Sequence, residues 1–376
     1  MKKVEFFKHN LSSRDIANLE KAARGLFLST GDLVTQFEKN FAKYMDAKYA
    51  LGVTSCTAAL HLALLALDIG PGDEVITTPL SFIATSNAIE YVGARPVFID
   101  VEPKTGNMNA AKIEAAITKR TRAILPVHLY GQMCDMKTIA AIARKHKLSV
   151  IEDAAHAIES TRDGIQPGKL SDAACFSFYA TKNLTSGEGG ALTTNNKKLA
   201  ERVRMLRQHG MSTTAADRYT KKYRHYDMLE LGFKYNMYNL QAALLIDQLA
   251  RLNVNLKKRA ALVARYEKAF AKNPKITRIT QLSETIAKTR SAHHLYTILV
   301  PKSRRDTVMH KLQDKNIGVA VNFRPIHKMS YYKNKYGTQS FPIAEDIGAH
   351  TISLPLYPRL TAAEQSYVIA CVNEAV

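Results

Sequence analysis

One lysine occupies a segment that is suited to covalent chemistry. The segment SFYATKNLTSGEGG spans residues 177–190 and places Lys182 just after an expected strand and ahead of a glycine-rich turn. A lysine amine attacks a carbonyl carbon only in its neutral form, and an enclosed site lowers the amine's pKa toward that form. We therefore take Lys182 as a candidate Schiff-base residue. A solvated surface charge is the ordinary alternative for a loop lysine.

A carboxylate and an imidazole follow a second expected strand. The run LSVIED ends in Asp153, and the next residues, AAHA, include His156. A carboxylate at this edge can keep the pyridine nitrogen of pyridoxal phosphate protonated, which makes the ring an electron sink. A helix-capping aspartate would look the same in sequence. Both roles for Asp153 stay open on the sequence alone.

Residues 54–60, TSCTAAL, close one expected strand and open a helix. Backbone amides and the hydroxyls of Ser55 and Thr57 could bind a phosphate at the positive helix end, although an ordinary helix cap has the same pattern. Phe82, in TTPLSFIATSNAI, is a candidate for stacking on a ring, and a plain core aromatic is the alternative.

These candidates share a predicted sheet edge. Between residues 50 and 195 short apolar runs alternate with amphipathic stretches, which predicts an α/β fold with a mainly parallel sheet covered by helices. Ligands collect at the carboxyl ends of strands in such sheets. The expected strands are Tyr49 to Val53, Glu74 to Thr78, Pro96 to Asp100, Ala123 to Val127, Leu148 to Glu152, Ala173 to Phe178 and Ala191 to Thr194.

The second half of the chain predicts a smaller α+β domain. A long helix over residues 239–270 is expected to bridge the two domains, which we place at 1–250 and 251–376. HHLYTILVP and GVAVNF read as strands flanking the helix DTVMHKLQDKN. A last helix is expected to begin with a capping box of Thr361 and Glu364.

Composition narrows the class of protein. The chain has 376 residues, 46% of them hydrophobic, which is enough for a substantial core. Its four cysteines form no C-x-x-C pair, so we predict neither a metal site nor a disulfide framework. The amino terminus lacks the apolar run of an export signal, and no stretch approaches the roughly 20 apolar residues of a membrane span. We expect a cytoplasmic protein without membrane insertion.

A formal net charge of +20 raises the alternative of a polyanion-binding protein. The basic residues are spread along the chain in short clusters, such as 257–259 and 303–305, without a basic tail or a DNA-binding motif. We therefore expect no nucleic-acid partner. A non-catalytic, nucleic-acid-binding protein stays the rival hypothesis, since charge alone does not decide; a substrate that carries a diphosphate would also benefit from this field.

Taken in order, seven segments resemble the DegT/StrS family of nucleotide-sugar aminotransferases. They are TGDLVTQFEKNFAKYMDAKYALGVTSCTAALHLAL, PGDEVITTPLSFIATSNAI, PVFIDVEP, IEDAAHAIES, FSFYATKN, EGGALTT and LGFKYNMYNLQAAL. The resemblance implies the fold type I of pyridoxal-phosphate-dependent transferases, like that of aspartate aminotransferase, with a seven-stranded sheet in the large domain. It also implies pyridoxal 5'-phosphate as cofactor, with pyridoxamine phosphate as a second form.

The resemblance assigns roles to individual residues. Lys182 matches the Schiff-base lysine, Asp153 the partner of the pyridine nitrogen, and His156 a residue near the ring hydroxyl. The other cofactor contacts that it implies are Phe82 and Ala155 on the ring faces, Thr57 with the backbone of Cys56 and Ser177 at the phosphate, and Asn236 from the neighbouring subunit of a homodimer with shared active sites.

The carboxyl-terminal part resembles a narrower branch of the family. VNFRPIHKMSYYKNKYG and ISLPLYPRLTAAE are similar to enzymes that aminate UDP-4-keto sugars in the 4-amino-4-deoxy-arabinose and pseudaminic-acid pathways. This branch implies glutamate as donor, a role in surface polysaccharide or lipopolysaccharide synthesis, and substrate contacts by Arg324 and His327. Cys56 replaces a glycine common in the family, and Lys182 disfavours the dehydratases, which carry histidine there. Amination at another sugar position stays open.

Overall fold

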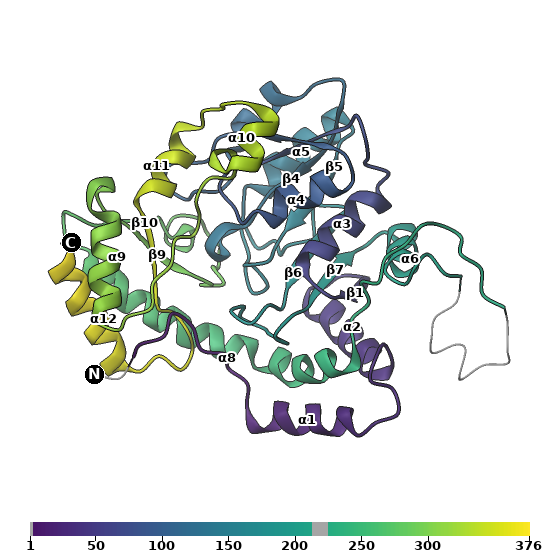
Figure 1. Cartoon of the computed structure of the whole chain (residues 1–376), viewed down its shortest axis with the longest axis horizontal. Coiled ribbons are helices and arrows are strands. Elements are labelled where there is room, and N and C mark those ends of the chain that lie inside the picture. The colour runs from purple at the N-terminus through teal and green to yellow at the C-terminus, as the bar shows by residue number, and fades with distance from the viewer. Residues whose placement is uncertain (1–2, 213–224) are drawn as a thin grey trace.

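Apolar side chains alternate across the strands of the main sheet, and this alternation fixes which helices cover each face. Leu51, Ile151 and Leu192 pack on one face, in a core shared with the helices α3 (Cys56–Ala66), α4 (Ala84–Tyr91) and α6 (Lys197–Leu206). Ala174 and Phe176 pack on the other face, in a core shared with α2 (Asp32–Tyr44) and α8 (Asn239–Phe270). The computed structural model describes residues 3–212 and 225–376 (Figure 1).

The main sheet has seven strands in the order β1-β7-β6-β5-β4-β2-β3. Strand β7 runs antiparallel to both of its neighbours, and the other pairs are parallel. The predicted α/β fold with a mainly parallel seven-stranded sheet is therefore confirmed. The strands are β1 (Tyr49–Val53), β2 (Glu74–Thr77), β3 (Arg95–Phe98), β4 (Thr121–Leu125), β5 (Ser149–Asp153), β6 (Ala173–Ser177) and β7 (Gly190–Thr194).

The helices of the larger part are α1 (Ser13–Ala23), α2 (Asp32–Tyr44), α3 (Cys56–Ala66), α4 (Ala84–Tyr91), α5 (Met136–His146), α6 (Lys197–Leu206) and α8 (Asn239–Phe270). The smaller part holds α9 (Arg305–Asp314), α10 (Ser330–Tyr336), α11 (Pro342–His350) and α12 (Ala362–Ala375) with the strands β8 (Thr277–Arg278), β9 (Tyr296–Leu299) and β10 (Thr351–Leu354). The predicted capping box of Thr361 and Glu364 is present at α12. Among the described residues no helix is long and apolar enough to cross a membrane.

One predicted strand is wrong. Residues 318–323, GVAVNF, form no strand, and only Ala320 makes a bridge, with Ser353 of β10. Strand β9 instead pairs antiparallel with β10 on one side and with β8 on the other. The reason is a competing partner: the N–H of Gly318 donates to the carbonyl of Val4, and the N–H of Val4 donates to that of Asn316. The amino-terminal segment therefore takes the hydrogen bonds that would have begun this strand.

Helix α8 belongs to both parts of the molecule. Its first half contributes Leu245 and Leu252 to the core under the main sheet, and its second half contributes Val263 and Phe270 to the core of the smaller part. The predicted bridging helix is thus confirmed, with the bounds that the sequence indicated. Figure 1 shows α8 running between the two parts with α1 beside it. We keep 1–250 and 251–376 as a proposed division, which cuts this continuous helix.

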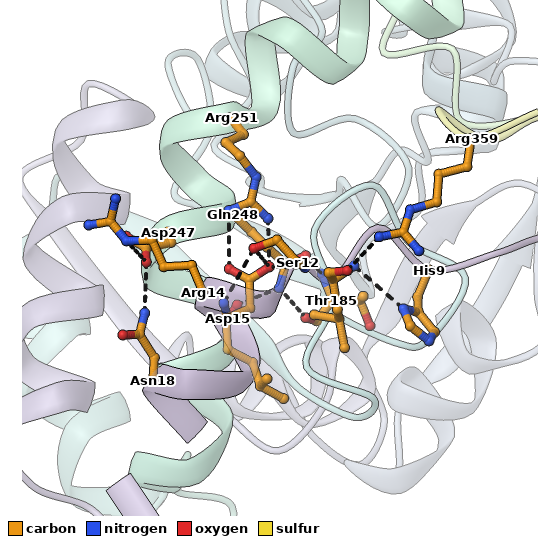
Figure 2. A network of polar contacts seen from close by, with 12 residues as sticks. His9, Ser12, Arg14, Asp15, Asn18, Thr185, Asp247, Gln248, Arg251 and Arg359 are labelled. Atoms are coloured by element: carbon orange, nitrogen blue, oxygen red, sulfur yellow. Dashed lines mark hydrogen bonds and ion pairs between the residues drawn. The ribbon is translucent and has the colours of Figure 1, made fainter. Parts of the chain in front are cut away.

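Helix α1 is tied to α8 by polar contacts that involve buried groups (Figure 2). Asp15 is fully buried, and both of its carboxylate oxygens accept hydrogen bonds from Arg251, at 3.1 and 2.6 Å. The same carboxylate accepts the backbone N–H of Ser12 in a capping box. One turn before Arg251, Gln248 donates to the carbonyl of Thr185 at 2.8 Å. The face of α8 that anchors α1 therefore also holds the turn that follows Lys182.

Asp15→Asn is expected to lower the free energy of unfolding by about 2 kcal/mol, because a buried, charge-assisted bidentate pair is lost. Denaturant unfolding of the purified variant measures this change. Glu20→Gln, which breaks the exposed pair with Arg24 on the same helix, serves as the control and should change the stability by less than about 0.5 kcal/mol. Equal effects of the two variants would contradict the structural importance of the Asp15 pair.

Candidate active site

Lys182 lies in the turn that follows β6, at the carboxyl edge of the main sheet. Its backbone N–H donates to the carbonyl of Tyr179, and the turn is closed by Thr185, whose hydroxyl donates to the carbonyl of Phe178. Burial lowers the pKa of the Lys182 amine to about 8, although the charge of Asp153 acts in the opposite direction. About a tenth of the amine is then neutral at pH 7, which makes it a usable nucleophile and base.

Asp153 ends β5 and faces the same space as Lys182. Its two carboxylate oxygens accept a hydrogen bond of 2.7 Å from the hydroxyl of Thr85 and one of 3.1 Å from the N–H of Ala155. Burial raises the pKa of Asp153, while these hydrogen bonds and the positive charge of Lys182 lower it. Each of the two charges thus shifts the pKa of the other, as expected when an amine and a carboxylate border one site.

His156 lies beyond Asp153 with its ring against two others. The imidazole is 4.2 Å from the ring of His294 and 6.0 Å, nearly parallel, from that of Phe323, measured between centroids. Burial, and then the charge of Lys182, hold the pKa of His156 well below its usual range. Its Nδ1 atom is buried and has no hydrogen-bond partner among the described residues. A neutral imidazole with an unused polar atom fits a position beside a polar ligand.

The predicted phosphate turn is built by a close approach of two backbones. Gly190 opens β7 and pairs with Val53 of β1 on one side and with Ser177 of β6 on the other. A Cβ at Gly190 would lie 2.6 Å from the backbone nitrogen of Cys56, so only glycine allows this approach. The start of α3 and the end of β6 therefore lie next to Gly190 on either side, and the positive end of α3 is suited to binding a phosphate.

The hydroxyls around this space have different partners. Ser55 is the N-cap of α3 and accepts the N–H of Ala58 at 3.0 Å, so its side chain does the capping that the sequence left open. Thr57 is partly exposed in the first turn of α3, and no contact of its hydroxyl competes with a ligand among the described residues. Ser177 accepts the N–H of Tyr179 at 3.3 Å and keeps its own proton for donation.

The remaining cofactor candidates differ in exposure. Phe82 is 57% exposed, with its ring 6.1 Å from that of Phe323. Such exposure beside the site is atypical of a core aromatic and suits a ring that covers a ligand. Ala155, two residues after Asp153, is partly buried and packs against the core that contains α3.

Asn236 is buried within its own chain. Its backbone bridges Val53 of β1, and its side-chain amide donates to the hydroxyl of Thr30 at 2.6 Å. The carbonyl oxygen of that side chain is buried without a partner among the described residues. Asn236 therefore lies beside Val53, the last residue of β1, which directly precedes the phosphate turn of residues 54–60. Its contact with a neighbouring subunit stays a prediction.

The two substrate candidates lie on the segment before α10. Arg324 is exposed and donates to the carbonyl of Lys328. His327 is buried, contacts Glu345 at 3.0 Å and packs its ring against Phe341. The structure thus leaves Arg324 accessible, while it surrounds His327 with its own chain. Both remain predictions as substrate contacts. In the described part of the chain no group of three or more His, Cys, Asp or Glu side chains is arranged to hold a metal.

Sequence reasoning missed three residues that touch the candidate groups. Thr85 holds Asp153, His294 lies 3.5 Å from the Lys182 amine, and Asn183 contacts His294. They come from α4, from the segment before β9 and from the lysine turn. The available signals were weak: a threonine on a helix after TTPLSF, and paired histidines ahead of the strand LYTILV.

Lys182→Met is expected to stabilise the cofactor-free protein by an amount that depends on pH, because burying the Lys182 amine lowers the free energy of unfolding. The amine's pKa is about 8 when folded and 10.5 when unperturbed, so the unfolded chain binds more protons between these values. The free energy of unfolding of the wild type therefore rises with pH between the two pKa values. The destabilisation caused by the buried amine is complete below pH 8. The advantage of the Met variant should fall by about 2 kcal/mol between pH 7 and pH 9.5 in denaturant unfolding. Lys119→Met, at an exposed position, is the control and should show a constant difference.

Comparisons with known proteins agree with this geometry. Two relatives match most of this chain: the spore coat polysaccharide biosynthesis protein SpsC of Bacillus subtilis (strain 168), 44% identical over 97% of this chain and 95% of its own, and the GDP-perosamine synthase of Caulobacter vibrioides, 41% identical over 93% and 91%. Among solved structures, Helicobacter pylori PseC, an aminotransferase involved in pseudaminic acid biosynthesis, superposes with a TM-score of 0.92 at 28% identity, covering 100% of this chain and 99% of its own.

A further neighbour, Spr1654 of Streptococcus pneumoniae, is known in a PMP-form and a PLP-form. Its PMP-form has a TM-score of 0.92 at 28% identity and covers 99% of this chain and 98% of its own. These neighbours confirm the predicted transferase fold and agree with the predicted cofactor. A model of the DegT/DnrJ/EryC1/StrS aminotransferase family matches residues 9–373. The chain therefore belongs to the DegT/DnrJ/EryC1/StrS aminotransferase family.

Proposed function

We propose that this protein is a pyridoxal-phosphate-dependent sugar aminotransferase, which moves an amino group from an amino acid to the keto group of a nucleotide-linked sugar. One observation carries the proposal: an amine with a lowered pKa, Lys182, shares a buried site with the carboxylate of Asp153 at the carboxyl edge of the sheet. Family membership adds the reaction class. The arrangement is also what argues against the rival, a non-catalytic nucleic-acid-binding protein.

The side chains of the site match the parts of the cofactor. When bound, pyridoxal phosphate supplies an aldehyde carbon that condenses with amines and a ring that draws electrons from the bonded carbon. Asp153, held by Thr85, would keep the ring nitrogen protonated, and Phe82 and Ala155 would border the ring faces. The start of α3 with Thr57 and Ser177 would hold the phosphate.

Lys182 then supplies the proton transfers. With a pKa of about 8, its Nζ atom can take a proton from the α-carbon of the donor and give a proton to the sugar carbon in the second half-reaction. The hydrogen bonds from Thr85 and from the N–H of Ala155 favour the charged form of Asp153, against burial, which raises its pKa. The neutral ring of His156 completes the wall of the site without adding a competing charge.

The finer proposal is L-glutamate as donor and a UDP-linked 4-keto sugar as acceptor, in the synthesis of a surface polysaccharide inside the cytoplasm. Support comes from the sequence resemblance of residues 321–337 and from the likeness to PseC. GDP is the rival nucleotide, because the GDP-perosamine synthase is 41% identical over nearly the whole chain. The exposed Arg324 is suited to donate hydrogen bonds to the diphosphate of either UDP or GDP.

A homodimer with shared sites is part of the proposal. Beside Asn236, three large apolar side chains are exposed: Leu26 at 89%, Leu231 at 76% and Tyr238 at 38%. The loop with Leu26 is joined to this region because Asn239 donates to the carbonyl of Phe27 at 2.8 Å. Exposed apolar groups gathered in one region are typical of an interface between chains. This surface adjoins the phosphate turn, where a second chain would complete the site.

The reaction is tested by absorbance and by product analysis. Purified protein with the cofactor should lose its long-wavelength absorbance when glutamate is added, and regain it with an accepted keto sugar. A panel of UDP-, GDP- and dTDP-linked 4-keto sugars identifies the acceptor. The position of the new amine in the product shows whether the sugar is aminated at C4 or at another carbon. Lys182→Met should show neither change. A wild-type protein that stays spectrally inert toward every amino donor would refute the aminotransferase.

The shared site is tested by mixing two inactive variants, Lys182→Met and Asn236→Ala, in one co-expression. If Asn236 acts on the partner's cofactor, each mixed dimer holds one intact site. Random assembly then restores about a quarter of wild-type activity. A mixture of Lys182→Met and Lys182→Ala is the control and should remain inactive. Failure of the first mixture to exceed its separate variants would place Asn236 in the site of its own chain.

A further inference from the structure

We infer that His294 is a positioning residue for Lys182: its Nε2 lone pair accepts a hydrogen bond from the lysine Nζ and so orients the free amine. The inference rests on the proposed function, in which that amine takes up and returns protons. His294 lies just before β9, 112 residues away from Lys182 in the chain, and the fold brings the two atoms to 3.5 Å. This distance is the long limit of a hydrogen bond, which orients the amine without immobilising it.

The neighbouring amide decides which ring nitrogen of His294 carries the proton. Asn183 follows Lys182, and its side-chain N–H groups donate to the carboxylate of Glu159 and to the carbonyl of Ala292, both at 3.0 Å. Its oxygen must then face His294, where it lies 3.3 Å from Nδ1. An amide oxygen only accepts hydrogen bonds, so Nδ1 carries the proton. The lone pair is therefore on Nε2, on the side of Lys182.

A buried ion pair holds the amide in this orientation. Glu159 and Arg259 are both almost fully buried and form an ion pair, and Arg259 also donates to the carbonyl of Ala292 at 3.2 Å. Arg259 of α8 thus holds both acceptors of the Asn183 amide, the Glu159 carboxylate and the Ala292 carbonyl. An inverted amide would place its oxygen against a carboxylate and a carbonyl, which is unfavourable. Helix α8 therefore determines which ring nitrogen of His294 carries the proton, and it acts through the side chains of Glu159 and Asn183.

The charges around His294 keep its ring neutral. Burial, followed by the electrostatic influence of His156, Lys182 and Arg259, holds the pKa of His294 well below its usual range. Asp153, and then Cys56, favour the charged form of Lys182. A neutral imidazole with a fixed tautomer is an acceptor and not a competing base. His294 thus directs the amine without removing its proton.

Packing alone is the competing account, since His294 also lies against His156 at 4.2 Å. Two substitutions separate the accounts. The amide nitrogen of Asn overlays Nδ1 of histidine, so His294→Asn keeps the contact to Asn183 and loses the acceptor for Lys182. The amide oxygen of Gln overlays Nε2, so His294→Gln keeps the acceptor and loses the contact to Asn183. His293→Asn is the matched control, because it makes the same substitution at the preceding residue and leaves His294 in place.

The first readout uses cofactor-free protein. Trace labelling with acetic anhydride across pH, read at Lys182 by mass spectrometry, gives the midpoint of its titration. An acceptor for the ammonium raises this midpoint, so His294→Asn should lower it by roughly 0.5 to 1 pH unit. Wild type, His294→Gln and His293→Asn should share one midpoint. Thermal unfolding of each variant establishes that it is folded.

The second readout is the rate and pH profile of the glutamate half-reaction, followed by absorbance. His294→Asn should react roughly tenfold more slowly than wild type, and His294→Gln should recover most of the rate. Equal losses in Asn and Gln, or a wild-type midpoint in His294→Asn, would overturn the inference. If wild-type protein fails to react with glutamate, the proposed function fails, while the midpoints in cofactor-free protein still decide whether His294 contacts the amine.

Discussion

The site depends on one unfavourable arrangement, an amine and a carboxylate withdrawn from water into the same space. Burial alone would neutralise both groups, raising the pKa of Asp153 and lowering that of Lys182. The hydrogen bonds from Thr85 and from the N–H of Ala155 favour the charged carboxylate and oppose the effect of burial. The amine keeps a pKa of about 8, because burial outweighs the charge of Asp153. Electron withdrawal by the cofactor ring and proton transfer by the amine depend on this pair.

The order and direction of the strands bring the candidate residues to one edge of the sheet. Strand β7 enters antiparallel between β1 and β6, so its first residue, Gly190, lies level with the last residues of its neighbours. The candidates that follow β1 and those at the end of β6 thus meet at one edge of the sheet. The absence of a side chain at Gly190 lets the backbone at the start of α3 approach β7 closely.

Much of this was predictable because it depends on local pattern. Apolar runs of strand length located the seven strands, and chemistry-bearing residues directly after them identified Lys182 and Asp153. The cap made by Ser55 was one of two open alternatives at that turn. What the pattern did not reveal came from residues brought together only by the fold. Thr85 and His294 carry no local signature, and GVAVNF has the composition of a strand but lost its hydrogen bonds to Val4.

The continuity of α8 limits how this protein can open and close. The helix has 32 residues, and each half is buried in a different core, so the two parts cannot rotate against each other unless the helix bends. Bending would strain the anchor that Arg259 provides near its middle. The continuous helix therefore fixes the core under the main sheet relative to the core of the smaller part.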